Sequence, residues 1–141
     1  MEKMVSIYLI DDNEVDRLIG EILLKKTFGK VNISSFSYAD QALKDLANKI
    51  IDQPQEFPNL ILLDLDMPLK DGWTFLNNYS RIIQNIPAPK PLIYILTASI
   101  NPTDINAAKE HPLVEDFLIK PFSVAAIEKI RHQILPLEYS V

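Results

Sequence analysis

Two hydrophobic patterns alternate along the chain, and they predict strands and helices in turn. Short, uninterrupted apolar runs are typical of strands buried on both faces of a sheet, whereas apolar residues spaced three and four apart are typical of amphipathic helices. The apolar runs predict strands at 5–10, 31–37, 60–63, 92–96 and 117–119. The helical pattern predicts helices from about 13 to 29 and at 39–51, 73–83, 102–109 and 124–135.

Three of the predicted helices carry a clear apolar stripe, which an amphipathic helix turns toward the core. The first stripe contains Val15, Leu18, Ile19, Ile22 and Leu23. The second contains Ala42, Leu43, Leu46 and Ile50. The last contains Val124, Ile127, Ile130, Ile134 and Leu135. Side chains suited to helix caps precede the first and last helices, at Asp12 or Asn13 and at Ser123, and Gly29 is placed to end the first helix.

The order of a strand followed by a helix, repeated five times, predicts an α/β fold. Apolar strands separated by amphipathic helices favour a parallel sheet covered on both faces, in a doubly wound arrangement. We expect a single domain over residues 1–141, because neither a linker nor an internal repeat interrupts the pattern. In such folds the ligand site lies beyond the carboxyl ends of the strands.

Composition narrows the class of function. The chain has 141 residues, a formal net charge of -5 and no cysteine. The acidic balance disfavours direct nucleic-acid binding, and the lack of cysteine excludes thiol catalysis and cysteine-ligated zinc. Apolar stretches fall short of the roughly 20 residues that a membrane helix needs. The sequence therefore predicts a cytoplasmic protein without membrane insertion.

Polar residues follow four of the predicted strands. Asp11 and Asp12 follow the first, Asp64 the third, Thr97 ends the fourth, and Lys120 follows the fifth. Taken singly, each has an ordinary explanation, such as a helix cap for Asp12 or a solvated surface lysine. Because the carboxyl ends of parallel strands share one edge of the sheet, we expect all five side chains to converge there.

The chemistry of this set favours a divalent metal and a phosphoryl group. Neighbouring carboxylates repel one another, and a cation relieves that repulsion. Oxygen ligands without a suitable cysteine or histidine indicate Mg2+ or Mn2+. A carboxylate beside such an ion can act as a nucleophile toward phosphorus, while a lysine neutralises charge on the phosphoryl oxygens and a threonine hydroxyl donates to one of them.

The ordered set of motifs resembles the receiver domain of two-component response regulators, in its stand-alone, CheY-like form. The matching segments are Ile10-Asp11-Asp12-Asn13, Leu62-Leu63-Asp64-Leu65-Asp66-Met67-Pro68, Asp71-Gly72, Leu96-Thr97-Ala98 and Phe117-Leu118-Ile119-Lys120-Pro121-Phe122. The resemblance covers residues 5 to about 135. It implies a flavodoxin-like fold with strand order 2-1-3-4-5, and no effector domain within the chain.

The resemblance also implies roles at the metal. Asp64 would be the phosphoacceptor and, together with Asp12, would bind Mg2+ directly. Asp11 would act on the metal mainly through water, and the backbone carbonyl of Asp66 would be a further ligand.

Other roles follow from the same resemblance. Lys120 and Thr97 would contact the phosphoryl group, with help from the backbone N–H of Ala98. Phe117 occupies the position of the aromatic switch residue that moves inward when Thr97 is drawn to the phosphate. The peptide bond between Lys120 and Pro121 is expected to be cis, as is usual in the family and uncommon elsewhere.

The partner implied by this resemblance is a sensor histidine kinase or a histidine phosphotransfer protein. Such a chain modifies itself and is not a turnover enzyme. Output is expected through the fourth helix, fifth strand and last helix, at 102–135. Whether that face serves a homodimer or a separate target is left open.

Two other functions compete with this interpretation. A phosphatase of the haloacid-dehalogenase class also uses a strand-end aspartate with a second aspartate two residues later, as in Asp64 and Asp66. Its nucleophile, however, follows the first strand and its acidic pair comes last, the reverse of the order here. A degenerate receiver that only binds partners is the other alternative. His111 and His132 do not follow strands and are expected to take no direct part in chemistry.

Overall fold

A computed structural model describes residues 4–65, 72–85, 90–98 and 101–135. The elements in chain order are β1 (Val5–Ile10), α1 (Glu14–Phe28), β2 (Val31–Phe36), α2 (Ala39–Asp52), the 3-10 turn η1 (Pro54–Glu56), β3 (Leu60–Asp64), α3 (Gly72–Ile82), the 3-10 turn η2 (Ile83–Asn85), β4 (Leu92–Thr97), α4 (Pro102–Glu110), β5 (Asp116–Ile119) and α5 (Val124–Ile134). Among the described residues, no helix is both long enough and apolar enough to cross a bilayer.

The five strands form one parallel sheet in the order β2-β1-β3-β4-β5, which confirms the predicted fold class and strand order. The register sets Ile10 beside Leu63, Asp64 beside Leu96, and Thr97 beside Ile119. The carboxyl ends of β1, β3, β4 and β5 therefore lie side by side at one edge of the sheet.

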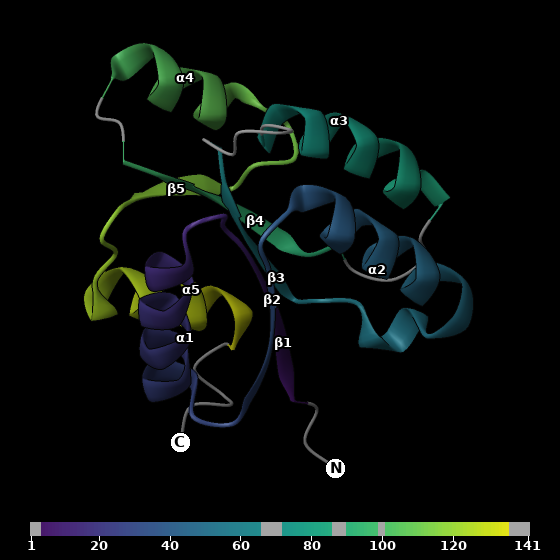
Figure 1. Ribbon diagram of the computed structural model, residues 1–141, viewed down its shortest axis with the longest axis horizontal. Coiled ribbons are helices and arrows are strands. Elements are labelled where there is room, and N and C mark those ends of the chain that lie inside the picture. The colour runs from purple at the N-terminus through teal and green to yellow at the C-terminus, as the bar shows by residue number, and fades with distance from the viewer. Residues whose placement is uncertain (1–3, 66–71, 86–89, 99–100, 136–141) are drawn as a thin grey trace.

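Helices cover both faces of the sheet (Figure 1), with α1 and α5 on one face and α2, α3 and α4 on the other. Side chains alternate between the faces along each strand. In β3, Leu60 and Leu62 pack toward α1 and α5, whereas Ile61 and Leu63 pack toward the other three helices. All four are fully buried, which explains why this strand is an uninterrupted apolar run.

Local signals begin and end α1, and begin α5, as predicted. The side chain of Asn13, rather than Asp12, caps α1 by accepting a hydrogen bond from the Asp16 N–H. Ser123 caps α5 in the same way. After α1, Gly29 has a φ of 75°, a left-handed conformation that favours glycine. The predicted core face of α2 is also confirmed, since Ala42 and Leu46 are fully buried.

Most of the apolar stripe predicted to face the core in α1 faces outward instead, and of its five members only Leu23 packs against the core. Val15, Leu18, Ile19 and Ile22 are 44–62% exposed, while the buried positions of α1 are Gly20 and Leu24. Gly20 permits a close approach, because a Cβ there would lie 3.0 Å from Leu9 and 3.1 Å from Phe122.

The start of α5 also differs from the expected pattern. Val124 was predicted to pack in the core, but it is 40% exposed at the start of the helix. Ile127 and Ile130 are buried as predicted, and Ile134 and Leu135 pack against the same core from partly buried positions. The core contact of α5 therefore begins one turn later than its apolar pattern does.

Candidate functional site

Three carboxylates meet at the carboxyl edge of the sheet. One oxygen from each of Asp11, Asp12 and Asp64 lies within 4.8 Å of the other two. Asp11 is 1% exposed and Asp64 is 4% exposed. Both are buried for the same reason, since each directly continues or ends one of the central strands β1 and β3. The predicted convergence of these three residues is confirmed.

Lys120 connects this cluster to the end of β5. Its Nζ lies 2.5 Å from an oxygen of Asp11, 3.1 Å from an oxygen of Asp16 and 3.3 Å from an oxygen of Asp64. Burial alone would lower the pKa of Lys120, but the hydrogen bond to Asp11 and the charges of Asp64 and Asp11, with a further hydrogen bond to Asp16, raise it above its ordinary value. Lys120 therefore carries a positive charge among three carboxylates, those of Asp11, Asp16 and Asp64.

Backbone and side-chain hydrogen bonds fix Asp11. Its N–H donates to the carbonyl of Phe36 in the neighbouring strand end at 3.1 Å. Its side chain accepts from the Asn13 N–H at 3.0 Å. Its carbonyl accepts from the Arg17 guanidinium at 2.7 Å. The start of α1 thus holds Asp11 in place through both its carboxylate and its backbone carbonyl.

Gly72, the first residue of α3, lies against the backbone of Asp64. A Cβ at this position would lie 3.0 Å from the Asp64 carbonyl oxygen and 2.9 Å from the side chain of Leu65. The Gly72 N–H also donates to the Leu65 carbonyl at 3.2 Å. A glycine is needed for α3 to start this close to the end of β3.

Thr97 and Phe117 occupy neighbouring strands. Thr97 is 3% exposed at the end of β4, and its carbonyl accepts from the Lys120 N–H at 2.8 Å. Phe117 is half-buried in β5, opposite Ile95, with the Lys109 ammonium 5.2 Å from its ring centre. Ala98 follows Thr97 and is exposed. The Lys120–Pro121 peptide bond is cis, as predicted.

One predicted site residue cannot be placed, and one site residue was missed. Asp66, expected to offer its backbone carbonyl to the metal, lies outside the described residues. Asp16 contacts Lys120 although the sequence analysis did not assign it to the site. A signal existed, because Asp16 falls one helical turn after Asp12 and side chains in a helix lean toward its N-terminus, here toward the strand ends.

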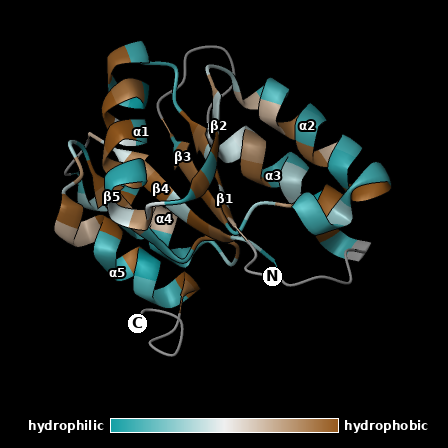
Figure 2. Cartoon of the chain, turned by 90° about the horizontal axis from the view of Figure 1, so that it is seen from below, coloured by the Kyte–Doolittle hydropathy of each residue, from teal (hydrophilic) through white to brown (hydrophobic). Residues whose placement is uncertain are grey.

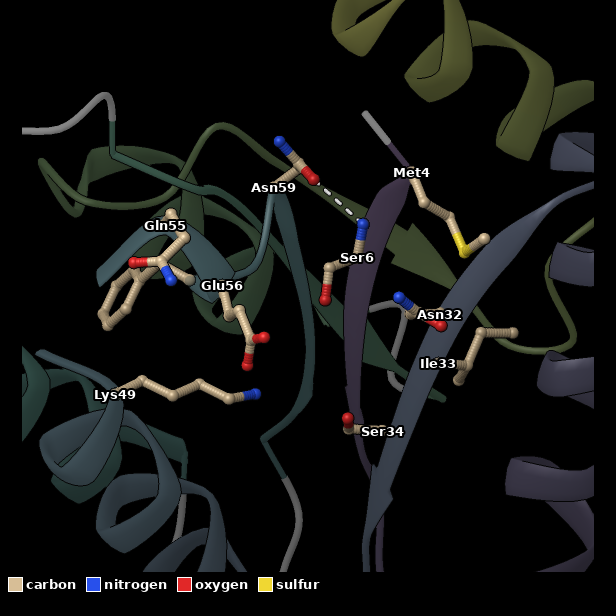
Figure 3. A pocket seen from close by; sticks show the side chains of 10 residues that line it. Met4, Ser6, Asn32, Ile33, Ser34, Lys49, Gln55, Glu56 and Asn59 are labelled. Atoms are coloured by element: carbon tan, nitrogen blue, oxygen red, sulfur yellow. Dashed lines mark hydrogen bonds between the residues drawn. The ribbon is translucent and has the colours of Figure 1, made fainter. Parts of the chain in front are cut away.

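A cavity of about 510 Å3 lies at the opposite end of the sheet. Its walls come from the amino ends of β1 and β2, from the end of α2 and from η1, and Lys49 and Glu56 point into it (Figure 3). The carboxylates of Asp11, Asp12 and Asp64 follow the carboxyl ends of the strands. The cavity is therefore separate from the candidate site.

The donor set of the site fits a small divalent cation. Carboxylate oxygens are the ligands that Mg2+ takes in proteins, usually one or two together with water and a phosphate. Asp11, Asp12 and Asp64 offer such oxygens close together, and Lys120 neutralises only part of their charge. Residual negative charge of this kind favours cation binding.

Similar proteins place the chain in a family. Residues 7–132 match the response regulator receiver domain. The response regulator Rcp1 of Synechocystis sp. is 34% identical over 74% of this chain and 69% of its own length. The sporulation initiation phosphotransferase F of Bacillus subtilis is 32% identical over 94% of this chain and 95% of its own length.

A solved structure supports the fold independently. A two-component response regulator from Cytophaga hutchinsonii superposes with a TM-score of 0.83 at 23% identity, over 95% of this chain and 98% of that one. The family match and the strand order agree with one another. The acidic pair after β1, with Asp64 at the end of β3, does not fit the haloacid-dehalogenase alternative, in which the nucleophile follows the first strand. The chain belongs to the response regulator receiver domain family, the phosphoacceptor signalling modules of two-component systems.

Proposed function

We propose that Asp64 is the residue of this chain that accepts the phosphoryl group. The observation that carries the proposal is the position of its carboxylate, which is nearly buried, lies close to Asp11 and Asp12, and has the Lys120 ammonium 3.3 Å away. A nucleophilic carboxylate beside a metal-binding pair and a fixed cation is the arrangement that phosphoryl transfer requires.

Transfer from a phosphohistidine donor forms one bond and breaks one bond. An oxygen of Asp64 forms the new bond to phosphorus, the bond from phosphorus to the imidazole nitrogen breaks, and its electron pair stays on that nitrogen. Lys120 then exchanges its contact with Asp64 for one with a phosphoryl oxygen. Because Lys120 is already charged and in place, little rearrangement is needed when negative charge arrives.

Mg2+ or Mn2+ is the proposed cofactor. Asp12 and Asp64 would hold the ion directly and Asp11 through water, with the carbonyl of Asp66 as a further ligand. The ion would supply charge neutralisation for the phosphoryl oxygens. The carboxylate cluster of this chain supports the assignment, since three acids around a single lysine leave net negative charge.

The readout proposed for phosphorylation uses β4 and β5. The Thr97 hydroxyl would donate a hydrogen bond to a phosphoryl oxygen, and the Ala98 N–H would donate another. Phe117 would follow Thr97 inward. The half-buried position of Phe117, on the strand next to β4, supports this role.

The partner proposed as donor is a sensor histidine kinase or a histidine phosphotransfer protein. The outward stripe of α1 (Val15, Leu18, Ile19 and Ile22) supports a protein donor. These large aliphatic residues belong to α1, which begins two residues after Asp12. Figure 2 shows hydrophobic bands along this helix. A partner that reaches Asp64 from this side would cover them. The face of α4, β5 and α5, where Ile119 and Val124 are 40–42% exposed, would serve output to a target or a second copy.

The test is phosphorylation by a small phosphodonor such as acetyl phosphate, with Mg2+, followed by intact-mass measurement. Asp64→Asn should abolish the added phosphoryl group, because an amide is not a nucleophile toward phosphorus. Asp52→Asn, the same change at an exposed position on α2, is the matched control and should be phosphorylated like the unmodified chain. Labelling of Asp64→Asn at the same rate as the wild-type chain would refute the assignment. An unmodified chain that takes no phosphoryl group would favour the degenerate receiver.

A further inference from the structure

Among the residues that the structure describes, Asp16 is the one carboxylate partner of Lys120 that does not come from the end of a strand. An ammonium group has three N–H donors, and Lys120 has three carboxylate partners, Asp11, Asp16 and Asp64. The side chain of Asp16 is 39% exposed, compared with 1% for Asp11 and 6% for Asp64. Asp16 therefore lies at the rim of the site, on the side of α1.

The other two partners acquire new contacts during the proposed reaction. Asp64 becomes bonded to phosphorus and loses part of its charge, and Asp11 acts on the metal. Asp16 belongs to neither event, since the three carboxylates that gather within 4.8 Å are Asp11, Asp12 and Asp64. Lys120 can thus keep its contact with Asp16 while its other two contacts change.

The position of Asp16 is itself well defined. Its N–H donates to the capping side chain of Asn13 at 2.9 Å, which fixes it in the first turn of α1. Helical side chains lean toward the N-terminus of their helix, so the carboxylate points back to the strand ends where Lys120 lies. The distance of 3.1 Å to Lys120 is that of a hydrogen-bonded ion pair.

We propose that Asp16 is a positioning residue for phosphoryl transfer, and that it holds the Lys120 ammonium at the rim of the site while Asp11 and Asp64 change partners. The inference rests on the phosphoacceptor role proposed for Asp64. It assigns to α1 a part in positioning Lys120, in addition to its part in fixing Asp11.

The experiment compares Asp16→Ala and Asp16→Asn with Glu14→Ala, using the limiting rate of phosphorylation by acetyl phosphate at saturating Mg2+. Glu14 is the matched control, because it is an exposed acid in the same first turn, and its removal makes the same change in net charge. Saturating Mg2+ and donor remove effects on their binding, and melting temperatures report any structural loss. Asp64→Asn is measured in parallel.

Asp16→Ala should slow the limiting rate roughly two- to fivefold relative to Glu14→Ala, the range expected for a partly exposed ion pair. Asp16→Asn should recover most of the rate, because its amide oxygen still accepts from Lys120. The half-saturating donor concentration should stay unchanged.

Three results would overturn the proposal. Equal rates for Asp16→Ala and Glu14→Ala would show that Asp16 has no role. A faster Asp16→Ala would show that Asp16 draws Lys120 away from the phosphoryl group. An Asp16→Asn variant as slow as Asp16→Ala would show an effect of charge alone. Labelling of Asp64→Asn at the same rate as the wild-type chain would instead refute the phosphoacceptor assignment. Failure of the Asp16 proposal and failure of the Asp64 proposal are thus distinguishable.

Discussion

His111 is held as a neutral imidazole just after α4. Its Nδ1 accepts a hydrogen bond from the Leu113 N–H at 3.2 Å, which requires that nitrogen to be unprotonated. Its ring also lies 6.1 Å from that of Trp73, measured between centres. Burial lowers the pKa of His111. The folded chain therefore binds a proton at this residue less readily than the unfolded chain does.

The sign of the resulting pH effect follows from this difference. The contribution of His111 to stability is complete above its ordinary pKa of about 6.5 and declines as the pH falls below it, because the unfolded state takes the proton first. We predict that the free energy of unfolding falls more between about pH 7 and about pH 5.5 in the unmodified chain than in His111→Asn, by up to about 1 kcal/mol. An asparagine oxygen keeps the acceptor and does not titrate. Urea denaturation at the two pH values measures the difference. The same exchange at the exposed His132, His132→Asn, is the control. Parallel declines in the unmodified chain and in His111→Asn would contradict the prediction.

At the scale of elements, α1 has an unusual division of faces. Its buried side consists of Gly20 and Leu24 with partly buried neighbours, and its outward side carries the stripe of Val15, Leu18, Ile19 and Ile22. A stripe that stays in water contributes nothing to folding through burial. It lies on the helix that carries Asp16, at the edge of the proposed phosphoacceptor site.

Two substitutions in α1 should separate folding from partner contact. Leu24→Ala should lower the free energy of unfolding by about 2–5 kcal/mol, because it opens a cavity in the core. Leu18→Lys should change it by less than about 0.5 kcal/mol, because an exposed position tolerates the charge. Leu18→Lys should also leave phosphorylation by acetyl phosphate unchanged but reduce transfer from a protein phosphodonor. Denaturant unfolding and the two phosphorylation assays measure these effects. A large loss of stability in Leu18→Lys would mean that the stripe is part of the core after all.

The hydrophobic pattern predicted the elements better than their orientation. Every predicted strand and helix exists, because uninterrupted apolar runs such as Leu60 to Leu63 have few alternatives to a buried parallel strand. The outward face of α1 was not predictable from periodicity, since the pattern of Val15 to Leu23 is the same whether the apolar stripe meets the core or a partner. The small size of Gly20 decides which face of α1 meets the sheet. The spacing of hydrophobic residues does not reveal this effect.

The site was predictable to the extent that strand ends determine it. Asp11, Asp12, Asp64 and Lys120 converge as expected because parallel strands share an edge. Asp16 was missed because it belongs to a helix, where only the three-dimensional start of α1 shows that it reaches Lys120. Strand ends can therefore be read from a sequence with more certainty than the first turns of the helices that follow them.

At the scale of the whole molecule, the acidic cluster lies across the ends of two adjacent interior strands, β1 and β3. Asp11 and Asp12 follow β1 and Asp64 ends β3, so their mutual repulsion acts across the middle of the sheet. The three carboxylates that contact Lys120 are Asp11, Asp16 and Asp64, so Asp12 adds charge to the cluster without taking part in those ion pairs. Binding of a cation should consequently stabilise the entire fold.

Addition of Mg2+ should therefore make the wild-type chain more stable than Asp12→Asn, although it is not the more stable of the two without metal. Without metal, Asp12→Asn should be at least as stable as the unmodified chain, because one of three neighbouring charges is gone. With Mg2+ at about a hundred times its dissociation constant, the unmodified chain should gain about 2.7 kcal/mol, whereas Asp12→Asn, lacking a proposed ligand, should gain much less. Thermal unfolding in a chelator and in Mg2+ measures both comparisons. Equal gains in stability for the two chains would show that Asp12 is not a metal ligand. An ion that binds only the folded arrangement of β1 and β3 must stabilise it by mass action. No gain in either chain would therefore refute the metal site itself.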